Sequence, residues 1–518
     1  MKLTFTVQPN EYWWGGCIAA AEKMPFDGET VYSIDLLRNK RTQTSPLFLS
    51  SLGRFVWCEE PYKISFDHGT VTAEGDAEIV LENGGSSLRE AYFTAMRKYF
   101  PFSGEKQTPR EFYEHPQFNT WMELTKFQNQ KDVLKYAEEV VASGYTPGIL
   151  MIDGTWQKAQ GVWDFNPDRF PDPKPMFDRL HELGFIVMIW ISPFVCSEGP
   201  MFQDLMTYRA GSEARAGRHA YNHLVRNEKG EVAIIKWWSG FSATYNFNLP
   251  DDCAHMDAQL QKLMEYGADG FKCDGGSYLP QAFLNLNSVW GGYSFAQLNE
   301  AWWKYGSKYK YHEFKDTWKS GGKYVIERLF DKDHRWTGNG LDCLIPHGLF
   351  AGLIGVPFIC PDMVGSGQWT AFLYGEVDEE LFIRMAECSA LFPMMQYSAI
   401  PARHLSEEGQ KICLAMAKLH EKMYPEIEPL ITNAEKTGEP ILRSLEFVYP
   451  HCGYEKITDE FMLGNDILVA PVLTQGARER AVVFPAGTWE DEAGNRYEGG
   501  QTVTVPAPLD VLPWFRRK

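Results

Sequence analysis

Three aspartates stand where short apolar segments of the chain end. Asp153 closes the run ILMID, Asp274 closes GFKCD, and Asp362 lies in PFICPDM. A carboxylate is costly to bury inside a strand, whereas at the end of a barrel strand it can face a ligand. A single aspartate there is as typical of a turn or a helix N-cap, so only several aspartates that converge on one edge indicate a site.

Asp274 has the most informative neighbours. Lys272 lies two positions earlier, on the same side of a strand, where its ammonium group favours the ionised carboxylate. Gly275 and Gly276 follow and leave room for a ligand. The sequence therefore predicts an ionised carboxylate beside an open binding site.

A repeating pattern of apolar runs and helical stretches begins near residue 116 and would position these aspartates. The pattern is typical of β/α units around a parallel sheet, and eight such strands close a barrel. The predicted strands are 118–124, 149–153, 185–192, 270–274, 324–330, 335–338, 356–363 and 393–399. The predicted helices include 131–143, 174–183, 252–266 and 378–391.

Shorter alternating segments flank this region on both sides. Residues 1–112 and 433–518 alternate apolar and polar positions between turn residues, as strands of antiparallel sheets do. We therefore expect an α/β protein with a catalytic (β/α)8 TIM barrel over 113–432 and an antiparallel β-sandwich domain at each end. An insertion at about 195–250 should lie after the third strand, where loops face the active site.

The composition restricts the classes of partner. The 518 residues carry 50 Lys and Arg against 68 Asp and Glu, a net charge of −18, which disfavours nucleic acid and anionic membranes as partners. No stretch approaches the roughly 20 apolar residues of a membrane span, and the N-terminus lacks a signal-peptide pattern. The ten cysteines are scattered, so we expect reduced thiols in a cytoplasmic protein with a neutral ligand. Formation of a homo-oligomer stays open.

Several motifs resemble glycoside hydrolase family 31. The segment ADGFKCDGGSYLP is similar to that family's nucleophile motif, and MIDGTW with DFNPDRFPDPKPMFDRLHELGFIVMIWISPF resembles its second and third barrel strands. RWTGNG and GLFAGLIGVPFICPDMVG resemble the acid/base segment and the strand after it. FMLGNDILVAPVLTQGARERAVVFPAGTWED is similar to the C-terminal sandwich, so the resemblance runs from about residue 116 to the end.

The resemblance implies that Asp274 is the nucleophile of a retaining α-glycoside hydrolase. It would attack the anomeric carbon and form a β-linked glycosyl-enzyme intermediate, which water hydrolyses in a second displacement. Two carboxyl groups roughly 5 Å apart perform such a reaction. A small saccharide or glycoside is then the expected ligand, with no metal and no organic cofactor.

The sequence departs from the family pattern at the second carboxyl group. The pattern WTGD places the general acid/base after Gly338, but this chain has Asn339 there. An amide neither donates a proton near neutral pH nor accepts one from water, so we expect impaired catalysis. We favour an engineered Asp to Asn variant over a naturally silent sugar-binding homologue, and we interpret Asp342 as a helix N-cap rather than a substitute acid.

Further residues correspond to positions that hold the sugar in the family. Asp153 and Arg328, the latter on the predicted fifth strand, match residues that bond sugar hydroxyl groups, and Lys272 and Asp362 adjoin them. Three tryptophans are expected to shape the pocket, although packing is as good an explanation for them: Trp121, Trp190 and Trp336.

The sugar itself is predicted from small features. FKCDGGSYLP lacks the Met-Asn-Glu that often follows the nucleophile in α-glucosidases, and with CPDMVG it resembles the branch that includes α-galactosidases. We therefore expect an α-galactoside. The alternatives are an α-glucoside, an α-xyloside or an α-N-acetylgalactosaminide, because single stereocentres are discriminated by only a few side chains. Transfer of the sugar to another sugar would use the same intermediate.

Overall fold

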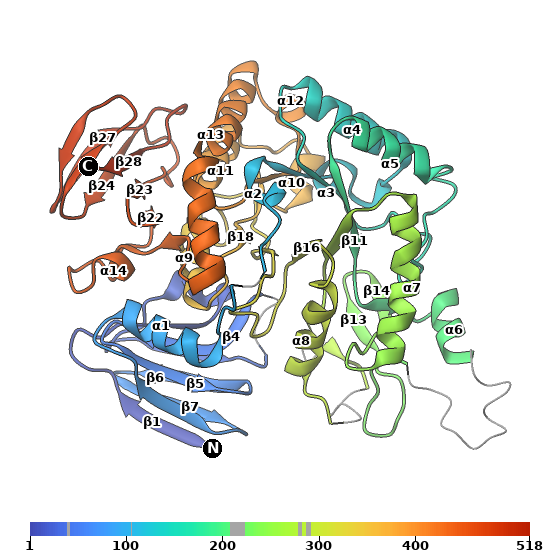
Figure 1. Ribbon diagram of the computed structural model, residues 1–518, viewed down its shortest axis with the longest axis horizontal. Coiled ribbons are helices and arrows are strands. Elements are labelled where there is room, and N and C mark those ends of the chain that lie inside the picture. The colour runs from blue at the N-terminus through green and yellow to red at the C-terminus, as the bar shows by residue number, and fades with distance from the viewer. Residues whose placement is uncertain (39–41, 105, 208–222, 278–281, 286–291) are drawn as a thin grey trace.

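The computed structural model describes residues 1–518 apart from 39–41, 105, 208–222, 278–281 and 286–291. Figure 1 shows the N-terminal sheets in blue at the lower left, the C-terminal sheets in red at the upper left, and the helices of the central region in the middle and on the right. Among the described residues, no helix combines the length and apolar character needed to span a membrane.

A parallel sheet of short strand segments forms the barrel. The segments are β9 (Gln117–Asn119), β10 (Ile149–Ile152), β11 (Ile186–Ile191), β15 (Gly270–Cys273), β16 (Tyr311–Phe314), β17 (Glu327–Arg328), β18 (Ile359–Cys360), β19 (Met363–Val364) and β20 (Gln396–Tyr397). Their order is β18-β17-β16-β15-β11-β10-β9-β20-β19. Only Pro361 and Asp362 separate β18 from β19, so the chain itself joins the two ends of the sheet. The predicted barrel is confirmed.

One predicted strand is absent, and one barrel strand was not predicted. Residues 335–338 form no strand, because the backbone of their loop is bonded locally: the Leu341 N–H donates to the Arg335 carbonyl oxygen at 3.0 Å. The fifth barrel strand is instead β16, which the sequence analysis missed. It buries His312 and Glu313, two polar residues that interrupt its apolar pattern. Arg328 consequently lies on the sixth barrel strand, β17, rather than the fifth.

Helices surround the sheet, and the four named from the sequence are confirmed to within two residues. They are α4 (Gln130–Ala142), α5 (Pro173–Glu182), α7 (Pro250–Tyr266) and α11 (Glu379–Ala390). α7 ends at Gly267, whose φ of 126° suits a residue without a side chain. The other helices of this region are α2 (Glu111–Glu114), α3 (Trp121–Leu124), α8 (Phe295–Gly306), α9 (Leu344–Leu353), α10 (Trp369–Leu373), α12 (Pro401–His404) and α13 (Glu407–Thr437). The predicted boundary at 432 falls inside α13.

Antiparallel sheets flank the barrel, as predicted. The first N-terminal sheet consists of β1 (Lys2–Thr6), β7 (Thr70–Gly75), β6 (Tyr62–Asp67) and β3 (Val31–Asp35). The second consists of β2 (Trp13–Cys17), β4 (Thr44–Ser50), β5 (Arg54–Cys58) and β8 (Ile79–Asn83), and α1 (Leu88–Tyr99) follows β8 in the chain. Phe48 and Phe66 join these two sheets, with ring centroids 6.3 Å apart. The C-terminal region contains α14 (Leu445–Val448), a sheet of β21 (Leu442–Arg443), β22 (Phe461–Leu463), β23 (Ile467–Val469), β28 (Trp514–Arg517), β25 (Thr488–Glu490) and β26 (Arg496–Glu498), and the pair β24 (Glu479–Phe484) and β27 (Gln501–Pro506).

A small antiparallel sheet follows the third barrel strand, within the predicted insertion. It consists of β12 (Phe194–Cys196), β14 (Gly240–Thr244) and β13 (Ile235–Trp237), and α6 (Pro200–Thr207) follows β12. Residues 208–222 of the predicted insertion lie outside the described part of the chain. This sheet places Trp237 and Trp238 beside a cavity at the carboxyl ends of the barrel strands.

Candidate active site

A cavity of about 410 Å³ lies beyond the carboxyl ends of the barrel strands. Its volume suits a small ligand. Five of the residues that the sequence singled out line it: Trp121, Asp153, Lys272, Asp274 and Arg328. The barrel explains their convergence, because four of them lie on a strand or directly follow one and Trp121 begins α3, just beyond β9.

Asp274 lies where β15 ends and is surrounded by hydrogen-bond donors. The Trp190 Nε1–H donates to Asp274 Oδ2 at 3.0 Å, and the Gly275 N–H donates to Oδ1 at 2.8 Å. Lys315 Nζ lies 3.5 Å from Oδ1. Burial by itself would raise the pKa of this carboxyl group, but Lys315, and after it Lys272, hold the pKa below its usual value. The carboxylate is therefore ionised and available as a nucleophile.

Lys272 has a different main partner from the one expected. Its ammonium group donates to Asp153 Oδ2 at 2.5 Å, and both side chains are almost fully buried. Asp153 and Lys272 therefore form a buried ion pair in the floor of the cavity. Among the described residues, the cation nearest to the Asp274 carboxylate is Lys315, which follows the unpredicted strand β16. The sequence analysis did not predict Lys315; the run YHEFKD alternates aromatic and charged residues there.

Arg328 is the centre of a cluster of carboxylates. Its Nη1 atom donates to Asp362 Oδ1 and lies 2.9 Å from Asp331 Oδ1, while its Nε is 3.8 Å from Glu313 Oε1. Asp362 is buried and does not line the cavity, so it holds Arg328 rather than facing a ligand. Burial and the nearby Asp331 raise the pKa of Asp362.

Asp331 faces the cavity and was not singled out from the sequence. Its side chain is 44% exposed, and Lys315 Nζ lies 2.8 Å from its Oδ2 atom. Burial acts to raise the pKa of Asp331, but Lys315 and Arg328 outweigh it and hold this pKa far below its usual value. Asp331 directly follows the predicted strand 324–330, but it was overlooked because nothing local distinguishes it from Asp333, two residues later.

Trp190, Trp336 and Asn339 are not among the residues that line the cavity, and Trp190 is fully buried behind it. The Trp336 Nε1–H donates to Asp378 Oδ2 at 2.9 Å, beside the start of α11. The Asn339 side-chain amide donates to the carbonyl oxygen of Asp331 at 3.1 Å. Asp342 does not cap α9; its carboxylate accepts the N–H groups of Gly338 and Gly340, at 2.9 and 3.2 Å.

Aromatic rings form one wall of the cavity. Trp238 is 46% exposed, and its ring centroid lies 6.2 Å from those of Trp121 and Trp190 and 5.0 Å from that of Trp237. Flat apolar rings of this kind suit the faces of sugars. Trp237 and Trp238 come from the insertion, whose structure could not be derived from sequence periodicity.

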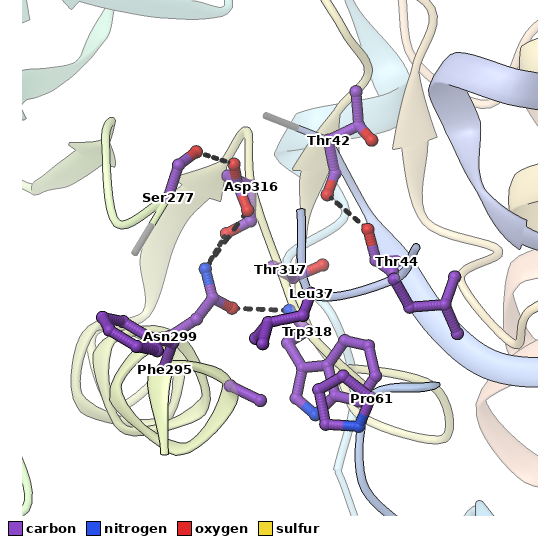
Figure 2. Close-up of a pocket in the computed structure, with 12 residues that line it drawn as sticks. Leu37, Thr42, Thr44, Pro61, Ser277, Phe295, Asn299, Asp316, Thr317 and Trp318 are labelled. Atoms are coloured by element: carbon purple, nitrogen blue, oxygen red, sulfur yellow. Dashed lines mark hydrogen bonds between the residues drawn. The ribbon is translucent and has the colours of Figure 1, made fainter. Parts of the chain in front are cut away.

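A narrower hollow adjoins the cavity on the side of the N-terminal sheets. Figure 2 shows Thr42 and Thr44 of the N-terminal region facing Ser277, Asn299 and Asp316 of the barrel. Ser277 and Asp316 line both spaces. The Ser277 hydroxyl and the Asn299 amide, the latter at 3.2 Å, donate to the Asp316 carboxylate. Asp316 thus connects Ser277, which follows β15, to Asn299 of α8.

One group of residues in the described part of the chain has the composition of a metal site. Ligand atoms of Glu22, Cys343 and His347 all lie within 4.8 Å of one another, at the contact between the 3-10 helix Ile18–Lys23 and α9. None of the three lines the cavity.

Comparisons with known proteins agree with this geometry. The model of the glycosyl hydrolase family 31 TIM-barrel domain matches residues 115–425, and that of the family 31 C-terminal domain matches residues 438–518. The myogenesis-regulating glycosidase of Mus musculus is 29% identical over 448 residues, which cover 82% of this chain and 59% of that protein. Alpha-glucosidase 2 of Bacillus thermoamyloliquefaciens is 23% identical over 534 residues, or 94% of this chain and 64% of that protein.

Solved structures show the same fold. The family 31 dextranase of Flavobacterium johnsoniae, in complex with glucose, superposes with a TM-score of 0.81 at 19% identity and covers 100% of this chain and 66% of that one. The chain thus spans about three fifths to two thirds of the length of these relatives.

Proposed function

The chain belongs to glycoside hydrolase family 31, and from that membership we propose that it is a retaining α-glycoside hydrolase with Asp274 as its nucleophile. The environment of Asp274 carries the proposal. Its carboxylate faces a cavity of suitable size, Lys315 favours its ionised form, and Trp190 fixes one of its oxygens. An oriented, ionised carboxylate beside an aromatic wall is what attack on a sugar's anomeric carbon requires.

The remaining polar groups are suited to holding the sugar. Arg328 and the Asp153–Lys272 pair present fixed donors and acceptors at the floor of the cavity, where they would bond hydroxyl groups. Buried polar groups discriminate strongly, because a ligand that lacks the matching hydroxyl leaves them unpaired. Trp121 and Trp238 would contact an apolar face of the sugar.

We propose an α-galactoside as the substrate. The support is the sequence around Asp274, which lacks the Met-Asn-Glu of many α-glucosidases, together with CPDMVG at Asp362. The relatives are named for other sugars, including an α-glucosidase and an α-xylosidase, so these are the alternatives to be tested beside it.

The test is turnover of the p-nitrophenyl α-glycosides of galactose, glucose, xylose and N-acetylgalactosamine, with Asp274→Ala as the inactive control. We expect release of nitrophenol from the galactoside, and an α-anomer as the first product in proton NMR. A β-anomer would refute retention, and turnover that survives Asp274→Ala would refute the nucleophile. Asn339→Asp belongs in the same panel, because a marked gain would identify position 339 as the acid/base.

A second candidate is a carbohydrate-binding protein that does not hydrolyse its ligand. Asn339 favours it, since an amide stands where the family pattern has a carboxyl group. It predicts saccharide binding by calorimetry with no turnover on any of the four substrates, in the chain as it stands and in Asn339→Asp.

A further inference from the structure

Retaining hydrolysis needs a second carboxyl group, and four aspartates line the described part of the cavity: Asp153, Asp274, Asp316 and Asp331. Two of the other three aspartates already have strong interactions. Asp153 is buried in its ion pair with Lys272, and Asp316, only 8% exposed, accepts hydrogen bonds from Ser277 and Asn299. Asp331 alone among these three exposes a large part of its side chain, 44%, to the cavity.

Lys315 places Asp331 at a suitable distance from the nucleophile. Its Nζ atom lies 3.5 Å from Asp274 Oδ1 and 2.8 Å from Asp331 Oδ2. The distance between these two carboxylate oxygens therefore cannot exceed the sum of their distances from Lys315 Nζ. That limit is below the roughly 6.5 to 9.5 Å that inverting enzymes use to admit a water molecule between their carboxyl groups, so the pair fits double displacement.

Asn339 supports the loop that carries Asp331. Its side-chain N–H donates to the Asp331 carbonyl oxygen at 3.1 Å, and its own carbonyl oxygen accepts the Asp333 N–H at 2.7 Å. Its φ of 76° is left-handed, a conformation that asparagine tolerates better than most residues. An aspartate at 339 would lose the donated hydrogen bond and oppose a carboxylate to a carbonyl oxygen.

We propose that Asp331 is the second catalytic carboxylate of this chain and that Asn339 is a positioning residue that holds its loop. The proposal rests on the proposed hydrolase function. In the second step a water oxygen bonds to the anomeric carbon, and the Asp331 carboxylate accepts a proton from that water. The bond from the anomeric carbon to Asp274 breaks, and its electron pair returns to the Asp274 carboxylate.

The surroundings of Asp331 also indicate which leaving groups the site favours. Lys315 and Arg328 contact its two oxygens and favour its ionised form, which is the base needed in the second step. In the first step the same ion pairs oppose protonation, so Asp331 is a poor proton donor. Glycosides whose leaving group departs as a stable anion, such as activated phenyl glycosides, need no proton: the glycosidic bond breaks and its electron pair leaves with the phenolate. We expect these to be far better substrates than alkyl glycosides.

The experiment compares Asp331→Ala with the unsubstituted chain on 2,4-dinitrophenyl α-galactoside, or on the corresponding glycoside that the panel above identifies. Because the first step needs no acid, Asp331→Ala should give a rapid burst of dinitrophenolate followed by turnover at least about 100-fold slower than that of the unsubstituted chain. Sodium azide, a nucleophile that needs no base, should restore turnover and yield the α-glycosyl azide. Asp333→Ala, on the same loop but outside the cavity, should show neither effect.

Several results would overturn the assignment. Unchanged steady-state turnover in Asp331→Ala would exclude Asp331 as the base, as would a β-glycosyl azide, which marks loss of the nucleophile instead. A large gain from Asn339→Asp, with Asp331→Ala unaffected, would move the role to position 339; we expect a loss in Asn339→Asp. Asp331→Asn, which keeps the shape of the side chain, repeats the test if the alanine variant melts at a lower temperature.

The failure of the hydrolase proposal has a different signature. If the unsubstituted chain releases no dinitrophenolate from any of the four sugars, the proposed function fails and this assignment fails with it. If the unsubstituted chain turns over and Asp331→Ala turns over equally well, only the assignment of Asp331 fails.

Discussion

Replacing Lys315 by methionine removes the cation that lies between Asp274 and Asp331 while keeping most of the side chain's volume. Two unit charges about 4 Å apart interact by about 4 kcal/mol at an effective dielectric constant near 20. Since one pKa unit corresponds to about 1.36 kcal/mol, the loss could raise the pKa of Asp274 by up to about three pH units. Lys272, Trp190 and the Gly275 N–H remain, so the rise should be smaller than this limit.

The assay is the pH dependence of kcat/KM on an activated aryl glycoside. The pKa of Asp274 is held low, so activity of the unsubstituted chain is lost only as the pH falls through that low value. In Lys315→Met, where the pKa is higher, the acidic limb should move upward by about one to three pH units. At alkaline pH Asp274 is ionised in both proteins, so a comparison of their kcat/KM values there tests whether Lys315→Met is folded.

Lys126→Met is the matched control. Lys126 also lines the cavity, but it makes no ion pair within the described part of the chain. Its removal should leave the acidic limb in place. An acidic limb that does not move in Lys315→Met, with the protein folded, would refute the view that Lys315 governs the charge of the nucleophile.

Three further changes have outcomes that follow from the structure. Trp190→Phe removes the hydrogen bond to Asp274 at 3.0 Å, and since bonds to charged groups contribute about 1.5 to 3 kcal/mol, kcat/KM should fall roughly 10- to 100-fold. Trp190 is fully buried, so the smaller ring should also lower the melting temperature, and kcat/KM is measured well below it; a fall under twofold would deny the bond a role. Lys272→Met leaves Asp153 buried without its partner and should lower the free energy of unfolding in urea by about 3 to 5 kcal/mol. The double variant with Asp153→Asn should recover part of that loss, and additive losses of the two single variants would contradict the pairing. Burial raises the pKa of Glu460 to about 8, so the folded chain holds a proton that the unfolded chain releases at lower pH, and this carboxyl group makes stability fall as the pH rises from about 4.5 to about 8. Glu460→Gln should flatten that part of the plot of melting temperature against pH, and an unchanged slope would refute the assignment.

The barrel was predictable because its periodic features are local. Apolar strand segments alternate with amphipathic helices such as α4 and α7, and helix ends carry their own signals, for example Gly267 after α7. Prediction failed where polar residues are buried. β16 places His312 and Glu313 among core residues, and that pattern is not recognisable before their partners are known.

The candidate site was predictable to the same extent. Asp153, Lys272 and Asp274 were found because each lies on a barrel strand or just after one, whereas Arg328 was found through its resemblance to the family's arginine. The partners of these residues were not predictable: Lys272 pairs with Asp153 across two strands that are 119 positions apart in sequence. Spacing along one strand indicated only that Lys272 lies near Asp274.

The sequence by itself determined the family, the barrel and the candidate nucleophile, because these depend on residue types at fixed local spacing. Only the tertiary structure decided which cation lies beside that carboxylate, which aspartate faces it, and that Asn339 bonds to the loop of Asp331. The physical reason is that charge interactions and hydrogen bonds depend on distances of a few ångströms between side chains from different strands and loops, and those distances exist only once the barrel has closed.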